Sequence, residues 1–150
     1  MPDSGRVIWA HYGKAAMILL DTSALIEFLN RTGSQWDTTV ETLLTSDADV
    51  AIADITLTEV LQGIRSERDY REVRASLMTF PILSLKDHDS YIKAADLYRK
   101  CRAKGLTIRS TVDLLIARIA IENSAELLHN DRDFEAIASV STLKLYRVEA

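Results

Sequence analysis

Short apolar runs alternate along the chain with longer segments in which apolar residues recur every three or four positions. The runs at 18–20, 50–53 and 127–128 are continuously apolar, a pattern typical of strands that are buried on both faces of a parallel sheet. Residues 82–85 form a plausible further strand, and 143–148 alternate apolar and polar side chains as an edge strand does. We therefore expect a mostly parallel sheet of about five strands.

Helical spacing fills most of the sequence between these runs. It covers residues 22–29, 35–44, 56–64, 70–77, 91–101, 110–120 and 133–137. Thr56 and Glu59 have the spacing of a capping box, Ser110 and Asp113 mark another helix start, and Gly105 ends the long helix before it. Because strands and helices alternate, the pattern predicts an α/β fold in which two helical layers enclose the sheet, a three-layer α/β/α sandwich.

The domain organisation follows from where this pattern begins. Residues 1–16 show no clear period, and the strong pattern starts at Met17. We interpret 1–16 as an N-terminal extension that need not belong to the natural product, and 17–150 as one domain. A chain of 150 residues with 47% hydrophobic residues is large enough for one core and too short for two ordinary domains.

Composition narrows the functional classes only slightly. The single cysteine, Cys101, cannot form an internal disulfide, and no apolar run approaches the ~20 residues of a membrane helix, so we expect a cytoplasmic protein that does not enter membranes. A net charge of −4 argues mildly against nucleic-acid binding. Basic residues nevertheless cluster at 65–74 and 99–109, although a solvated helix face is the simpler interpretation of each cluster.

Four acidic residues map to one predicted edge of the sheet, where the carboxyl ends of the strands meet the starts of the following helices. Asp21 ends the first strand and Asp131 follows the strand at 127–128, whereas Glu59 and Asp113 lie in predicted first turns of helices. Each acid alone is explained equally well as a helix cap or a turn residue. Their joint placement predicts a shared acidic pocket.

Such a pocket needs a neutralising partner, because two like charges ~4 Å apart repel by about 4 kcal/mol at an effective dielectric near 20. Protonation or an arginine can provide it, but an all-oxygen carboxylate site suits Mg²⁺ or Mn²⁺ best. His11, His88 and His129 are isolated and do not form a zinc motif. Hard divalent ions held by carboxylates are typical of enzymes that cut phosphodiesters. Arg109 is either a contact for the scissile phosphate or an ordinary surface arginine.

The acidic residues lie in segments that resemble a known family. The sequence resembles PIN-domain ribonucleases, specifically VapC-type toxins of type II toxin–antitoxin systems, from Met17 to the C-terminus. The resemblance rests on four segments in the family order, which are Met17-Ile18-Leu19-Leu20-Asp21-Thr22-Ser23-Ala24-Leu25, Thr58-Glu59-Val60, Asp113-Leu114-Leu115-Ile116-Ala117 and Asn130-Asp131-Arg132-Asp133-Phe134. Each motif is weak alone, and the ordered set is specific.

The resemblance implies a set of site residues. The acids that would form the catalytic Mg²⁺ or Mn²⁺ site are Asp21, Glu59, Asp113 and Asp131. Asp133 either assists them or caps the helix that contains Phe134. Thr22 or Ser23 would contact the substrate or hold a water on the metal, with N-capping as the simpler role of Ser23.

The resemblance also implies an activity and partners. The chain would be a metal-dependent endoribonuclease acting on structured RNA such as tRNA or rRNA, inhibited by a cognate VapB-like antitoxin and commonly homodimeric. One alternative is a catalytically silent PIN-fold module that only docks RNA or a protein. Another is a metal-dependent phosphatase or a DNA nuclease. Against a phosphatase, the segment Asp21-Thr22-Ser23 lacks the second aspartate that aspartyl-phosphate enzymes place two residues after the nucleophile.

Overall fold

The computed structural model describes residues 16–148, so the predicted N-terminal extension lies outside the described residues except for Ala16. The elements in chain order are β1 (Ile18–Leu20), α2 (Thr22–Leu29), α3 (Gln35–Thr45), β2 (Val50–Ala53), α4 (Asp54–Leu61), α5 (Glu67–Leu77), β3 (Ile82–Leu83), α6 (His88–Ala103), α7 (Thr111–Glu122), β4 (Glu126–Leu128), α8 (Asp133–Ser139) and β5 (Lys144–Leu145). Among the described residues, no helix is both long enough and apolar enough to cross a membrane.

The five strands form one sheet in the order β3-β2-β1-β4-β5, and every neighbouring pair is parallel. This confirms the predicted parallel sheet. From β1 the chain adds β2 and then β3 on one side of the sheet. It then returns to the other side of β1 and adds β4 and β5. The end of β1 is therefore the point where the strand order reverses, which in open α/β sheets is the usual place for a functional crevice.

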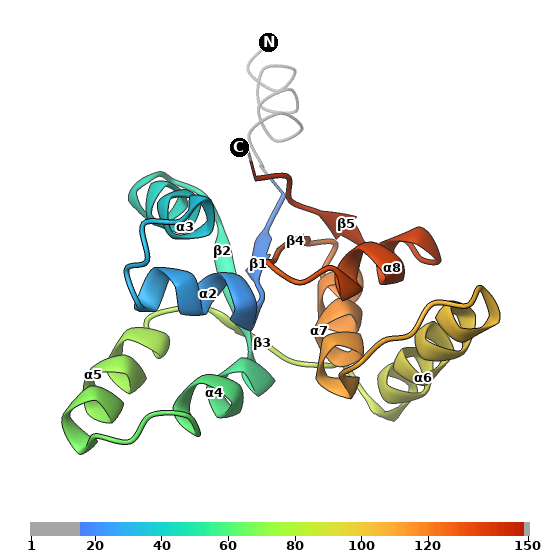
Figure 1. Cartoon of the computed structure of the whole chain (residues 1–150), viewed down its shortest axis with the longest axis horizontal. Helices are drawn as coiled ribbons and strands as arrows, with labels where there is room; N and C mark the ends of the chain where they lie inside the picture. The colour runs from blue at the N-terminus through green and yellow to red at the C-terminus, as the bar shows by residue number, and fades with distance from the viewer. Residues whose placement is uncertain (1–15, 149–150) are drawn as a thin grey trace, which may run out of the picture.

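Helices cover both faces of the sheet, as Figure 1 shows. Leu19 and Leu127 point to the core shared with α6, α7 and α8, whereas Leu20 and Ile52 point to the core shared with α2, α3 and α5. These strand residues are fully buried, because successive side chains of a strand face opposite layers and both layers are packed. The α/β/α sandwich predicted from the sequence is confirmed.

Several predicted element bounds differ from those of the structure. The strands β3 and β5 each span two residues and are shorter than the predicted 82–85 and 143–148. Helix α4 begins at Asp54, so the capping box predicted at Thr56 and Glu59 is wrong. Thr56 is fully buried and its hydroxyl oxygen lies 3.3 Å from that of Thr22, so it joins two helices and does not start one.

Candidate metal centre

The four predicted acids lie at the carboxyl edge of the sheet, and a fifth, Asp133, joins them. Asp21 directly follows β1, and Asp131 follows β4 after two further residues. Asp113 lies in the first turn of α7, and Asp133 is the first residue of α8. Electrostatic coupling links Asp113 to Asp21, Asp131, Asp133 and Glu59, so segments far apart in the sequence meet in one acidic site.

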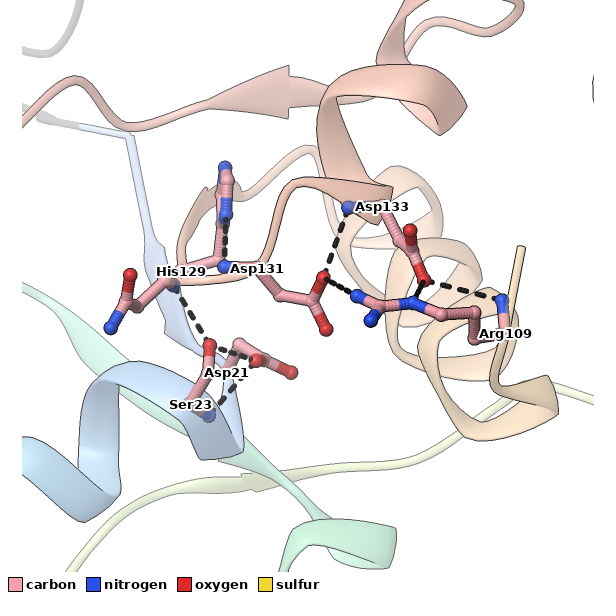
Figure 2. Close-up of polar contacts among 7 residues, drawn as sticks. Asp21, Ser23, Arg109, His129, Asp131 and Asp133 are labelled. Carbon is pink, nitrogen blue, oxygen red and sulfur yellow. Dashed lines mark hydrogen bonds and ion pairs between the residues drawn. The ribbon is translucent and has the colours of Figure 1, made fainter. Parts of the chain in front are cut away.

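Asp21 is the N-cap of α2 and is almost completely buried. Its Oδ2 accepts hydrogen bonds from the Ser23 backbone N–H at 2.9 Å and from the Ser23 hydroxyl. The Ser23 hydroxyl also accepts the Asn130 N–H at 2.8 Å, so this serine ties the end of β1 to the loop after β4 (Figure 2). The simpler role predicted for Ser23, that of N-cap, is therefore wrong.

Glu59 is held by Thr22, the first residue of α2. The Thr22 hydroxyl donates to Glu59 Oε1 at 2.7 Å. Because α4 begins at Asp54, Glu59 lies beyond the first turn of that helix, and the predicted placement in the first turn is wrong. Glu59 therefore cannot cap the start of α4, and its carboxylate instead faces α2.

Asp113, Asp131 and Asp133 form the tightest part of the site, with one carboxylate oxygen of each lying within 4.8 Å of the others. The capping explanation also fails for Asp113, because Ser110, the N-cap of α7, makes no side-chain cap hydrogen bond. The residue before α8 that acts as its N-cap is Arg132, so Asp133 is not the predicted cap. The first turn of α7 and the segment that leads into α8 thus contribute three clustered carboxylates.

Arg109 binds two of these carboxylates. Its Nε donates to Asp133 Oδ2 and its Nη2 donates to Asp131 Oδ1, both at 3.3 Å, and its backbone N–H donates to Asp133 Oδ2 at 3.2 Å (Figure 2). The hydrogen bond to Asp133 raises the pKa of the Arg109 guanidinium above its usual range. Arg109 is exposed, as expected of a surface arginine, but its guanidinium forms the edge of the acidic site.

His129 has a structural role at the loop that carries Asp131, although this particular contact was not predicted. Its Nδ1 accepts the Asp131 backbone N–H at 3.1 Å, and its ring lies 5.2 Å from that of the fully buried Phe134. A histidine after an apolar strand gives no signal of this contact in the sequence. Because Nδ1 accepts, the neutral imidazole carries its proton on Nε2.

Burial and crowding disfavour the ionised form of the carboxyl groups at this site. Burial raises the pKa of Asp113 to about 7, with smaller contributions from Asp21 and Asp131. Burial also raises the pKa of Asp21 to about 6, against the lowering effect of the two hydrogen bonds from Ser23. Desolvation and like charges both favour the protonated carboxyl, and a bound cation would reverse both effects.

The side chains present fit a hard divalent cation. Asp21 Oδ1 is buried and has no hydrogen-bond partner among the described residues. An orphaned buried carboxylate oxygen is costly unless something positive binds it. The other candidate ligand atoms at the site are carboxylate oxygens, which Mg²⁺ and Mn²⁺ prefer as ligands.

The sequence profile of the PIN domain matches residues 18–140 of this chain. The chain belongs to the PIN-domain family. The match spans all four acidic segments, from the end of β1 to α8. The acidic edge described above is therefore contained within the PIN domain itself.

Relatives of this PIN domain are VapC proteins. The VapC ribonuclease Mb1587 of Mycobacterium bovis and ribonuclease VapC11 of Mycobacterium tuberculosis are each 35% identical over 129 residues, which cover 85% of this chain and 96% of the relative. Ribonuclease VapC17 of M. tuberculosis is 36% identical over 94 residues, covering 61% of this chain and 70% of the relative. This chain is thus a PIN domain of the VapC type.

Solved structures with the same fold come from toxin–antitoxin complexes. DNA-bound VapBC from Salmonella typhimurium matches with a TM-score of 0.71 at 20% identity, over 88% of this chain and 98% of that one. VapBC2 from Rickettsia felis, bound to a DNA fragment from its promoter, matches with a TM-score of 0.69 at 23% identity, over 87% and 97% of the two chains. At these identities the likeness concerns the fold.

Proposed function

We propose that this chain is the toxin of a type II toxin–antitoxin system and a Mg²⁺- or Mn²⁺-dependent endoribonuclease that hydrolyses phosphodiester bonds in structured RNA, tRNA or rRNA. The observation that carries the proposal is the convergence of five carboxylates from four segments on one sheet edge, where burial raises the pKa values of Asp21 and Asp113. A surface used only for docking gains nothing from such repulsion. The names of the VapC relatives as ribonucleases support the activity.

The metal ligands in this proposal are Asp21, Asp113, Asp131 and Glu59, with Asp133 as a further candidate. When bound, a divalent ion would supply a Lewis acid for the phosphate and lower the pKa of an attacking water. Asp113, Asp131 and Asp133 are already close enough to share one ion. Asp21 contributes the buried oxygen that otherwise has no partner.

The neighbouring polar side chains have positioning and binding roles in the proposal. Thr22 orients Glu59 through its hydroxyl, and Ser23 orients Asp21 while fixing the loop at Asn130. Arg109 is the candidate contact for the scissile phosphate, because its guanidinium is exposed at the edge of the acids and presents several N–H donors. All three residues lie beside the acids without being ligands themselves.

The partners in the proposal are a VapB-like antitoxin and a second copy of the chain. Two hollows of about 680 and 590 Å³ lie among α2, α3, α4 and α5, and the second is lined by Glu59 together with apolar residues of α2 and α5. This combination of apolar and acidic lining suits a basic amphipathic antitoxin segment. Tyr91 and Ile92 are exposed on α6, where a homodimer would bury them. A light-scattering mass of one chain for the isolated protein would exclude the homodimer.

The test is cleavage of purified total tRNA and rRNA by the isolated protein with Mg²⁺ or Mn²⁺, beside an EDTA control and the variant Asp21→Asn. Discrete products that disappear in both controls are the expected result. Failure to cut any RNA, with divalent-metal binding intact, would reject the nuclease and favour a silent docking module with the same fold.

A further inference from the structure

A third hollow adjoins the acidic site at the loop after β4. It measures about 310 Å³ and is lined by residues of four segments, the start of α3, the loop at 129–132, Glu135 of α8 and residues 146–148 after β5. Asp131 lines this hollow and also belongs to the carboxylate cluster. Whatever occupies the hollow would therefore lie directly beside the proposed cleavage site.

Two half-buried aromatic residues, Trp36 and Tyr146, line the hollow. The Trp36 Nε1–H donates to the His129 carbonyl oxygen at 2.8 Å, which fixes the indole against the loop that carries Asp131. Trp36 and Tyr146 also pack on the core shared with α2 and α3. Their rings are therefore held in place before any ligand arrives, which lowers the entropic cost of binding.

The remaining lining is mostly polar and carries both signs of charge. Arg147 forms an ion pair with Glu135 at 2.7 Å, whereas Arg132 is exposed and makes no ion pair with any residue of 16–148. The side-chain amides of Gln35 and Asn130 also line the hollow, and each offers both hydrogen-bond donors and acceptors. Aromatic faces, arginine and amides together are the groups with which proteins bind unstacked RNA bases and their phosphates.

We propose that this hollow binds one unstacked nucleotide of the RNA next to the bond that is cut. The base would lie against Trp36 or Tyr146, and the adjoining phosphate would contact Arg132. The inference rests on the proposed ribonuclease function and assigns the part of the substrate that the acidic site does not reach. It selects single-stranded loops over continuous duplex, because a paired and stacked base cannot enter.

Fluorescence of Trp36 tests the contact directly. Trp9 and Trp36 are the two tryptophans of the chain, so Trp9→Phe leaves Trp36 as the sole emitter. This variant is titrated in EDTA, which prevents metal-dependent cleavage, with a six-nucleotide single-stranded RNA and with an abasic oligomer of the same length. We expect saturable quenching by the RNA and much less by the abasic oligomer. Equal quenching by both oligomers would overturn the proposal that the hollow binds a base. RNA binding that is seen by anisotropy but causes no quenching would overturn it as well.

A charge variant tests the phosphate contact without disturbing the core. Arg132→Gln should raise KM for RNA about tenfold and leave kcat and the melting temperature nearly unchanged. Lys93→Gln is the matched control, because Lys93 is also exposed and lies on α6 away from the hollow. An unchanged KM in Arg132→Gln rejects the contact, whereas the absence of RNA cleavage by the unmodified protein with Mg²⁺ or Mn²⁺ rejects the proposed function itself.

Discussion

At the scale of single residues, the acidic site destabilises the metal-free protein. The pKa of Asp113 rises from 3.8 to about 7 on folding, and that of Asp21 rises to about 6. The folded carboxyls thus keep their protons to higher pH than the unfolded ones. Between pH ~4 and ~7 the folded state binds more protons than the unfolded state, so its stability falls as pH rises through this window, and the loss is complete above it.

The first prediction concerns Asp113→Asn without metal. At pH 8 the melting temperature should rise by a few degrees, because the variant removes a buried charge that four other acids disfavour. At pH 4 the difference should nearly vanish, since the carboxyl is then protonated in the folded protein. Calorimetry measures the melting temperatures of the variant and the native protein across this pH range. A lower melting temperature of the variant at pH 8 would show that Asp113 is needed as a structural residue.

The second prediction concerns Arg109, the cation that pairs with Asp131 and Asp133. Arg109→Gln should lower the metal-free melting temperature at pH 8 by a few degrees, because the clustered carboxylates lose their only bonded guanidinium within residues 16–148. Arg147→Gln is the control, as it removes another exposed arginine, which pairs with Glu135. Equal effects of the two substitutions would mean that Arg109 is an ordinary surface residue.

At the scale of elements, one hydroxyl links the start of α2 to α4. Thr22→Val preserves the side-chain shape but deprives Glu59 of its donor. We predict a loss of about 1–2 kcal/mol in the free energy of unfolding, measured by urea denaturation. Thr22→Ser keeps the hydroxyl and should lose much less. If Thr22→Val is as stable as the native protein, the hydrogen bond between Thr22 and Glu59 does not contribute to the free energy of unfolding.

The two basic clusters give a further prediction about elements. Arg65 lines the hollow that contains Glu59, and Arg68 lies at the start of α5, so Arg65→Glu with Arg68→Glu should weaken RNA binding at least tenfold in an anisotropy assay. Arg102→Glu with Lys104→Glu tests the cluster at the end of α6 in the same way. Unchanged affinity in either pair removes that cluster from the RNA-binding surface.

Element types could be predicted from the sequence more reliably than element bounds. Apolar runs predicted the buried strands β1, β2 and most of β4, because burial on both faces leaves no polar positions. The spacing of Thr56 and Glu59 imitates a capping box, yet α4 starts at Asp54 and Thr56 is buried against Thr22. Local patterns cannot reveal that tertiary contact. The alternation at 143–148 likewise overstates β5, which pairs with β4 over two residues only.

At the scale of the whole molecule, the parallel topology explains why the site was predictable in outline. All strands run in one direction, so residues that follow them reach the same edge. The sequence could not show which acids lie closest together. The tightest group is Asp113, Asp131 and Asp133, and the ion pairs of Arg109 depend on how α7 and α8 pack, which no local spacing encodes.

The central claim is that these carboxylates form one divalent-metal site, and titration calorimetry with Mn²⁺ tests it most directly. The native protein should bind Mn²⁺ saturably at pH 7.5, and a concentration of 100 times Kd should stabilise it by about 2.7 kcal/mol. Asp113→Asn should lose this binding while remaining folded. Saturable binding that survives in Asp113→Asn, or no binding by the native protein, would contradict the account.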